Sequence, residues 1–186
     1  MRPKIAALWA VAAAVAIGTA FADAGRTGKT ETIRGTIYTA KDHTGITAVN
    51  VIATDGTMYS VLLDKRGVEL GDEMANKRVE ITGVVTQNGA KIIRVQGWSP
   101  LVTGRVEAVK NEAGNITLVK LISPEGTYEV VLDDKGQELG HSMNGRSVDV
   151  VGTIRKQKGV TGLQQIVVKD FDERQEPAVK RPEGCE

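Results

Sequence analysis

The sequence of this 186-residue chain repeats itself once. Residues 59–71 read YSVLLDKRGVELG and residues 128–140 read YEVVLDDKGQELG, an offset of 69. At that offset, segments 59–83 and 128–152 are identical at 11 of 25 positions. The period is longer than the ~20–50 residues of solenoid repeats and suits a small domain. The sequence therefore predicts a duplicated domain, with copies at residues 31–98 and 101–171.

Each copy carries the pattern of about five strands and one short helix. Apolar residues recur at every second position in 79–85 and again in 148–154, which is typical of a strand with one buried face. Leu70 and Met74, four residues apart, predict one or two helical turns within 65–76. The remaining strands of the first copy are expected at 32–40, 47–54, 59–63 and 91–95, and their counterparts include 102–109 and 164–168.

The order of these elements indicates the fold class. Three strands, a short helix and two more strands in about 70 residues is the order of the OB-fold barrel. We therefore expect an all-β protein of two tandem, small, five-stranded OB-like barrels, each with one short helix. An SH3-like barrel or an open meander would give similar patterning.

Two motifs in the second copy carry a resemblance. The stretch LDDKG at 132–136 precedes the expected helix, and VDVVGT at 148–153 forms the strand after it. These segments resemble small secreted bacterial OB-fold domains, and the resemblance covers both copies. The first copy departs from the motifs at Lys65 and Val84. The motifs are structural, so the resemblance implies ligand or partner binding and assigns no catalytic residue.

The N-terminus has the pattern of a cleaved export signal. Arg2 and Lys4 precede an almost wholly apolar stretch at 5–20, and small residues then recur at Ala20, Ala22 and Ala24. We expect cleavage after Ala24, with Ala22 as the second choice. The apolar run is shorter than the ~20 residues that span a bilayer, which disfavours an uncleaved anchor. The sequence therefore predicts a periplasmic or secreted protein with no membrane span after signal removal.

Charge and aromatic content bear on the partner. Without Arg2, Lys4 and Asp23 the chain holds 22 basic and 22 acidic residues and is formally neutral. Aromatic residues make up only 4% of the whole sequence. Single-strand binding needs a positive groove and aromatic platforms, so these averages argue against a nucleic-acid partner.

Two weak candidate binding sites remain. Trp98 lies at the junction of the two copies, where it either caps the first core or helps to form an interdomain surface. Arg155, Lys156 and Lys158 form a basic cluster in an expected loop between the last two strands of the second copy. Oligonucleotide binding through that loop and the faces of strands two and three is the alternative function.

The residues that carry catalysis or bind metals are sparse. His43 and His141 do not occupy equivalent positions, and neither has the close His or Cys company of a zinc site. We find no nucleophile motif or phosphate loop and expect no enzyme, no metal and no cofactor. The main hypothesis is thus an exported, non-enzymatic binding or scaffolding protein for a partner protein, glycan or small ligand.

The last segment, 172–186, is polar and is expected to form a disordered tail. It holds Cys185, the one cysteine of the chain. In an oxidising compartment a lone thiol can form an intermolecular disulfide, although nothing around Cys185 indicates a docking surface.

Overall fold

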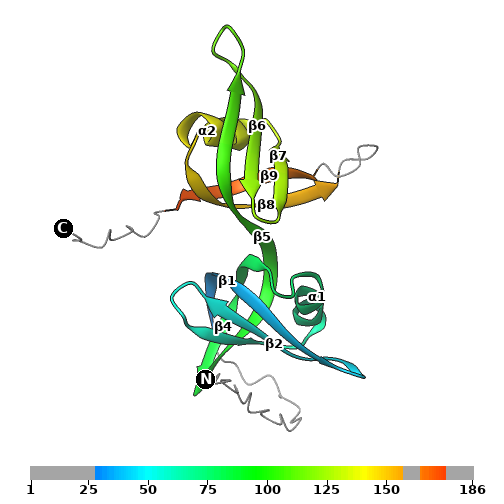
Figure 1. Ribbon diagram of the computed structural model, residues 1–186. Coiled ribbons are helices and arrows are strands. Elements are labelled where there is room, and N and C mark those ends of the chain that lie inside the picture. Colours follow the sequence, from blue (N-terminus) through cyan, green and yellow to red (C-terminus); the bar gives the residue numbers. More distant parts are fainter. Residues whose placement is uncertain (1–27, 157–163, 175–186) are drawn as a thin grey trace, which may run out of the picture.

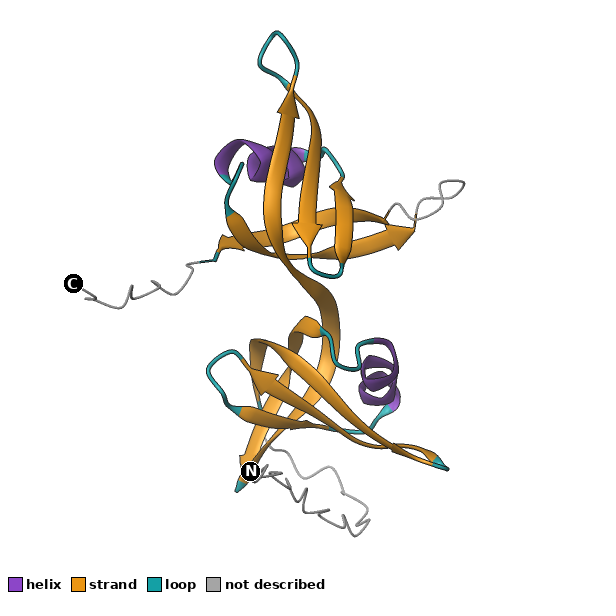
Figure 2. Cartoon of the chain, viewed as in Figure 1, coloured by secondary structure: helices purple, strands orange, loops and turns teal. Residues whose placement is uncertain are grey.

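The computed structural model of the protein describes residues 28–156 and 164–174. The expected signal segment with Ala22 and Ala24, Lys158, and Cys185 in the expected tail lie outside the described residues. Within them the chain forms strands and two short helices, as Figures 1 and 2 show. In chain order these are β1 (Lys29–Asp42), β2 (Gly45–Ala53), β3 (Met58–Val61), α1 (Lys65–Glu73), β4 (Arg78–Asn88), β5 (Ala90–Lys110), β6 (Ile116–Ser123), β7 (Gly126–Val130), α2 (Asp134–Ser142), β8 (Ser147–Lys156) and β9 (Gln164–Glu173).

The strand pairings close two barrels. In the first, β1 pairs antiparallel with β2 and β4, β2 pairs with β3, and β5 closes the ring against β3 in parallel and β4 in antiparallel. In the second, β5 pairs with β6 and β8, β6 with β7, and β9 closes the ring against β7 and β8. Both rings have OB connectivity with the helix after the third strand. The expected all-β fold of two five-stranded OB-like barrels is confirmed.

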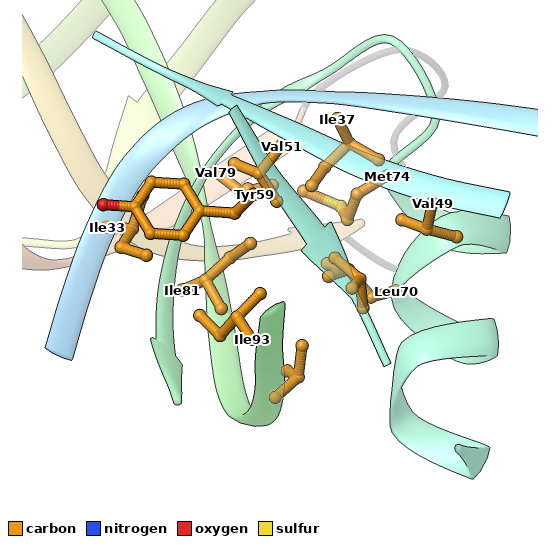
Figure 3. Close-up of a cluster of buried hydrophobic side chains, with 12 residues drawn as sticks. Ile33, Ile37, Val49, Val51, Tyr59, Leu70, Met74, Val79, Ile81 and Ile93 are labelled. Atoms are coloured by element: carbon orange, nitrogen blue, oxygen red, sulfur yellow. The ribbon is translucent and has the colours of Figure 1, made fainter. Parts of the chain in front are cut away.

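Each barrel is filled by the inward side chains of its alternating strands. Figure 3 shows the first core, where Ile37, Val51, Leu70 and Ile81 are fully buried and Tyr59 is 7% exposed. The second core contains the equivalent residues, including Leu139 and Tyr128. Because side chains alternate along a strand, burial of one set turns the intervening residues to the outside.

The two helices begin and pack in the same way. Asp64 and Asp133 are the N-cap residues, and their side chains accept hydrogen bonds from the backbone N–H groups of Gly67 and Gly136 at 3.0 and 2.9 Å. A Cβ added at Gly71 would collide with Cγ2 of Val49, so this glycine lets α1 lie close against β2. Helix α1 is a regular nine-residue helix.

Strand β5 belongs to both barrels. It runs without interruption from Ala90 to Lys110 and passes from the lower to the upper barrel in Figure 1. Val79 of β4 pairs with Pro100, and Val151 of β8 pairs with Leu101, so β5 changes partners between these two residues. The boundary expected at residues 99–100 therefore falls inside a strand.

Buried apolar residues and polar contacts between the barrels lie at this point. Leu101 and Val151 are 5% and 1% exposed and belong to neither core cluster. The Nζ of Lys169 on β9 donates a hydrogen bond to Oγ of Ser99 at 2.8 Å. Arg78 of β4 donates two hydrogen bonds to the carboxylate of Asp149 on β8, at 2.8 and 3.1 Å. The two barrels thus share a strand and are also held by side chains.

A second ionic cluster at the junction surrounds Arg34 of β1. Its Nε donates to Glu80 at 2.6 Å, its Nη2 donates to Asp170 at 3.0 Å, and its Nη1 pairs with Asp172. Burial acts to lower the pKa of the Arg34 guanidinium, but the hydrogen bonds to Asp172 and Glu80 outweigh burial and raise that pKa above its ordinary value. Arg34 therefore remains charged and binds carboxylates of both barrels.

Among residues 28–156 and 164–174, no helix has the length and apolar character needed to cross a bilayer.

Candidate functional site

The candidate residues that the structure describes, Trp98, Arg155 and Lys156, lie on different strands of different barrels. Trp98 lies on β5 opposite Ile81, is partly buried, and packs against the first core. Arg155 and Lys156 lie in β8, paired with Gln165 and Gln164. Their placement in a loop was wrong, because the β8–β9 ladder continues to Lys156.

The described residues also hold no group of three or more His, Cys, Asp or Glu side chains arranged to bind a metal. His43 is exposed in the turn between β1 and β2, and His141 is exposed in the last turn of α2.

A more coherent site lies on the outside of the first barrel. Inward burial of Ile37, Val51 and Tyr59 turns their sequence neighbours outward on three adjacent strands. The strand register arranges these neighbours in two rows, which we call the β1–β3 face. Its six residues are Tyr38, Asn50 and Ser60 in one row and Thr36, Ile52 and Met58 in the other.

The β1–β3 face exposes one aromatic and two apolar side chains. Tyr38 is 47% exposed, Ile52 is 40% exposed and Met58 is 62% exposed. Ser60 Oγ donates a hydrogen bond to Oδ1 of Asn50 at 3.2 Å. These two polar side chains lie in the same row as the Tyr38 ring. Together these residues offer a surface for stacking with a hydrogen-bonding group in its middle.

None of the six residues of the β1–β3 face is charged, and a basic residue, Arg94, lies at its border. Ile92 of β5 pairs with Ser60 and continues the first row, and the exposed Arg94 lies two residues further along β5. Lys91 alternates with Ile92, and its Nζ lies 5.2 Å from the centroid of the inward-facing Tyr59 ring, so Lys91 does not belong to this border. An anion lying across the face would therefore meet positive charge at the β5 side and no carboxylate in the rows.

The same positions of the second barrel have different chemistry. Glu107, Lys120 and Glu129 form the row that corresponds to Tyr38, Asn50 and Ser60. Glu129 accepts a hydrogen bond from Gln165 at 3.3 Å. Two carboxylates in one row would repel a phosphate backbone.

The balance of basic and acidic residues also differs between the two barrels. Residues 28–100 contain nine Lys and Arg against eight Asp and Glu, whereas residues 101–156 and 164–174 contain nine against eleven. The first barrel is therefore the more favourable one for an anionic ligand.

Sequence reasoning missed the β1–β3 face because it weighed averages over the whole chain. The signal was present in the alternation: buried residues at 37, 51 and 59 require outward residues at 38, 50, 52, 58 and 60. Mapping those outward positions onto adjacent strands would have placed Tyr38 beside Asn50.

Comparison with known proteins found matches among solved structures. No protein-family model and no curated protein matches the chain. The structure of a deletion mutant of the single-stranded DNA binding protein from Thermus aquaticus is similar over 84% of this chain and 98% of its own, with 13% identity and a TM-score of 0.29. The wild-type structure of that protein is similar over 83% and 97%, with 11% identity and a TM-score of 0.30.

These matches correct the functional expectation. The sequence had favoured a partner protein, glycan or small ligand and had argued against nucleic acid, whereas both matched structures are of a single-stranded DNA binding protein. The main hypothesis is therefore withdrawn. At TM-scores of 0.29 and 0.30, the function of this chain has to be worked out from its own surface.

Proposed function

We propose that the protein binds single-stranded nucleic acid on the β1–β3 face of the first barrel. The observation that carries this proposal is the row of Tyr38, Asn50 and Ser60, in which an exposed aromatic ring lies beside hydrogen-bonding groups with no carboxylate in the row. OB barrels bind oligonucleotides on the face of their second and third strands, and β2 and β3 supply four of the six residues of the β1–β3 face.

Each part of the face has a role in such binding. The ring of Tyr38 is a stacking platform for one base, and every base has a π-face that can use it. Met58 and Ile52 offer apolar contact to the next base, since both are at least 40% exposed. Arg94, at the border, is placed to neutralise a backbone phosphate.

The second barrel serves as a support rather than a second site. Glu107 and Glu129 make its equivalent row repulsive to phosphate. Its position relative to the first barrel is held by the shared strand β5 and by the pair Arg78–Asp149.

The signal at 1–24 leads us to propose that binding takes place outside the cytoplasm, in the periplasm or after secretion. We also propose that the two barrels arose by duplication within a group of secreted bacterial OB-fold proteins, on the basis of the repeat between residues 59–83 and 128–152. The proposed activity is binding without turnover.

Fluorescence anisotropy tests the proposal. Purified protein is titrated into a labelled single-stranded oligonucleotide at low salt, alongside the variants Tyr38→Ala and Glu107→Ala. Loss of stacking should weaken binding by about fivefold or more in Tyr38→Ala, since base–aromatic stacking contributes ~1–3 kcal/mol per base.

Glu107→Ala is the matched control, because Glu107 occupies the equivalent position of the second barrel and its substitution should leave affinity the same or slightly higher. Absence of salt-sensitive binding by the wild-type protein would refute the proposed function. Equal affinities of the wild type and Tyr38→Ala would refute the assigned face.

A further inference from the structure

The side-chain amide of Asn50 is oriented by its neighbour on β3. Asn50 lies between Tyr38 on β1 and Ser60 on β3, and its Oδ1 accepts the hydrogen bond of the Ser60 hydroxyl at 3.2 Å. The oxygen and nitrogen of an amide diverge from the same carbon, so Nδ2 faces away from Ser60. With Oδ1 engaged by Ser60, the N–H₂ group of Asn50 is the part of the amide left to bind a base on this face.

A fixed amide orientation determines which base edges it can bind. A free asparagine pairs with adenine by donating to a ring nitrogen and accepting from the exocyclic N6–H₂. An asparagine that presents its nitrogen toward the base can donate but cannot accept there. The N–H₂ group of such an asparagine would meet the N6–H₂ group of adenine, and two donors cannot hydrogen-bond to each other. It can instead donate to a base edge that carries two adjacent acceptors.

Two bases have such an edge. Guanine carries O6 and N7 side by side, and cytosine carries O2 and N3. In thymine and uracil the ring N3–H donor separates the two carbonyl oxygens, and in adenine every ring acceptor of the Watson–Crick or Hoogsteen edge adjoins N6–H₂.

We propose that Asn50, oriented by Ser60, makes the β1–β3 face select cytosine or guanine over adenine at the position stacked on Tyr38. The inference rests on the proposed function and adds the class of base to it. Asn50 is the residue that contacts the base, and Ser60 is a positioning residue that acts through Asn50. The expected order of affinity differs from that of stacking alone, because the larger adenine ring stacks at least as well as cytosine.

The experiment compares oligo(dC) and oligo(dA) of equal length at neutral pH, by anisotropy, with the wild-type protein and the variants Ser60→Ala and Asn50→Ala. The wild type should bind oligo(dC) about fivefold or more tightly than oligo(dA), the discrimination of a single base contact of this kind. Ser60→Ala frees the amide to turn, so the ratio should fall towards one mainly because oligo(dA) binding improves. Asn50→Ala should also remove the preference, by weakening oligo(dC) binding.

A gain of oligo(dA) affinity in Ser60→Ala is the readout that a merely structural role would not produce. Equal binding of both homopolymers by the wild type, or a preference unchanged in both variants, would overturn the inference while the proposed function stands. Absence of binding to either homopolymer would overturn the proposed function and this inference together.

Discussion

Replacing one leucine of the second barrel tests whether the two barrels unfold as a unit. Leu139 on α2 is fully buried in the second core, and truncation of such a leucine to alanine costs about 2–5 kcal/mol. With a urea dependence of about 1–3 kcal/mol per molar, Leu139→Ala should lower the midpoint of unfolding by roughly 1–2 M.

The fluorescence of Trp98 reports on unfolding of the first barrel. Trp98 packs against the first core, and the other tryptophan of the sequence, Trp9, lies within the expected signal. Because β5 is shared and the contacts Arg78–Asp149 and Lys169–Ser99 also link the barrels, Leu139→Ala should shift the Trp98 transition as far as the global one.

Urea unfolding is followed by Trp98 fluorescence and by far-ultraviolet circular dichroism in a chain that begins after Ala24. Leu70→Ala, at the equivalent position of α1, is the matched control and should produce the same coincident shift. A Trp98 midpoint that stays at the wild-type value in Leu139→Ala, while circular dichroism becomes biphasic, would refute coupling between the barrels.

Three further outcomes follow from local contacts. Gly71→Ala should destabilise the fold by about 1–3 kcal/mol in thermal unfolding, because the new methyl group collides with Val49. This cost should exceed the gain from the better helix propensity of alanine. A raised melting temperature would contradict the close packing of α1 against β2. Burial alone would raise the pKa of Asp149, but the hydrogen bonds from Arg78 and Thr103 and the positive charges of Arg78 and Arg174 together outweigh it and hold that pKa below its ordinary value of 3.8. The Asp149 carboxylate therefore stabilises the fold above pH 3.8 and loses this effect as the pH falls below 3.8. The difference in melting temperature between the wild type and Asp149→Asn should accordingly become smaller below pH 3.8. A difference that does not depend on pH would count against the Arg78–Asp149 ion pair. Arg94→Gln should make the plot of log affinity against log salt shallower by ~0.7 for single strands, and an unchanged slope would remove Arg94 from the site.

The fold could be predicted from the sequence because the segments of both barrels carry the same local patterns. Alternation of apolar residues identifies strands, and the spacing of Leu70 and Met74 indicates the helix, whose start Asp64 caps in the structure. The continuous strand β5 could not be predicted in this way. Pro100 resembles a linker residue because proline cannot donate to a ladder, yet it lies where β5 changes its partner from β4 to β8.

The candidate site was harder to predict because it depends on register. Net charge and aromatic content are sums over the chain, and they hide a neutral face with one exposed ring. Tyr38 becomes significant only when its cross-strand neighbours, Asn50 and then Ser60, are known. The same register turns the second barrel's row into Glu107, Lys120 and Glu129, so similar folds present different surfaces.

Mapping of amide chemical shifts by ¹H–¹⁵N NMR, while unlabelled single-stranded oligonucleotide is added to the purified protein, tests the central claim most directly. Binding on the β1–β3 face predicts that the shifts concentrate at residues 36–38, 50–52 and 58–60, with the strands of the second barrel unchanged. Shifts centred on Glu107, Lys120 and Glu129, or a spectrum that does not change at low salt, would contradict the claim.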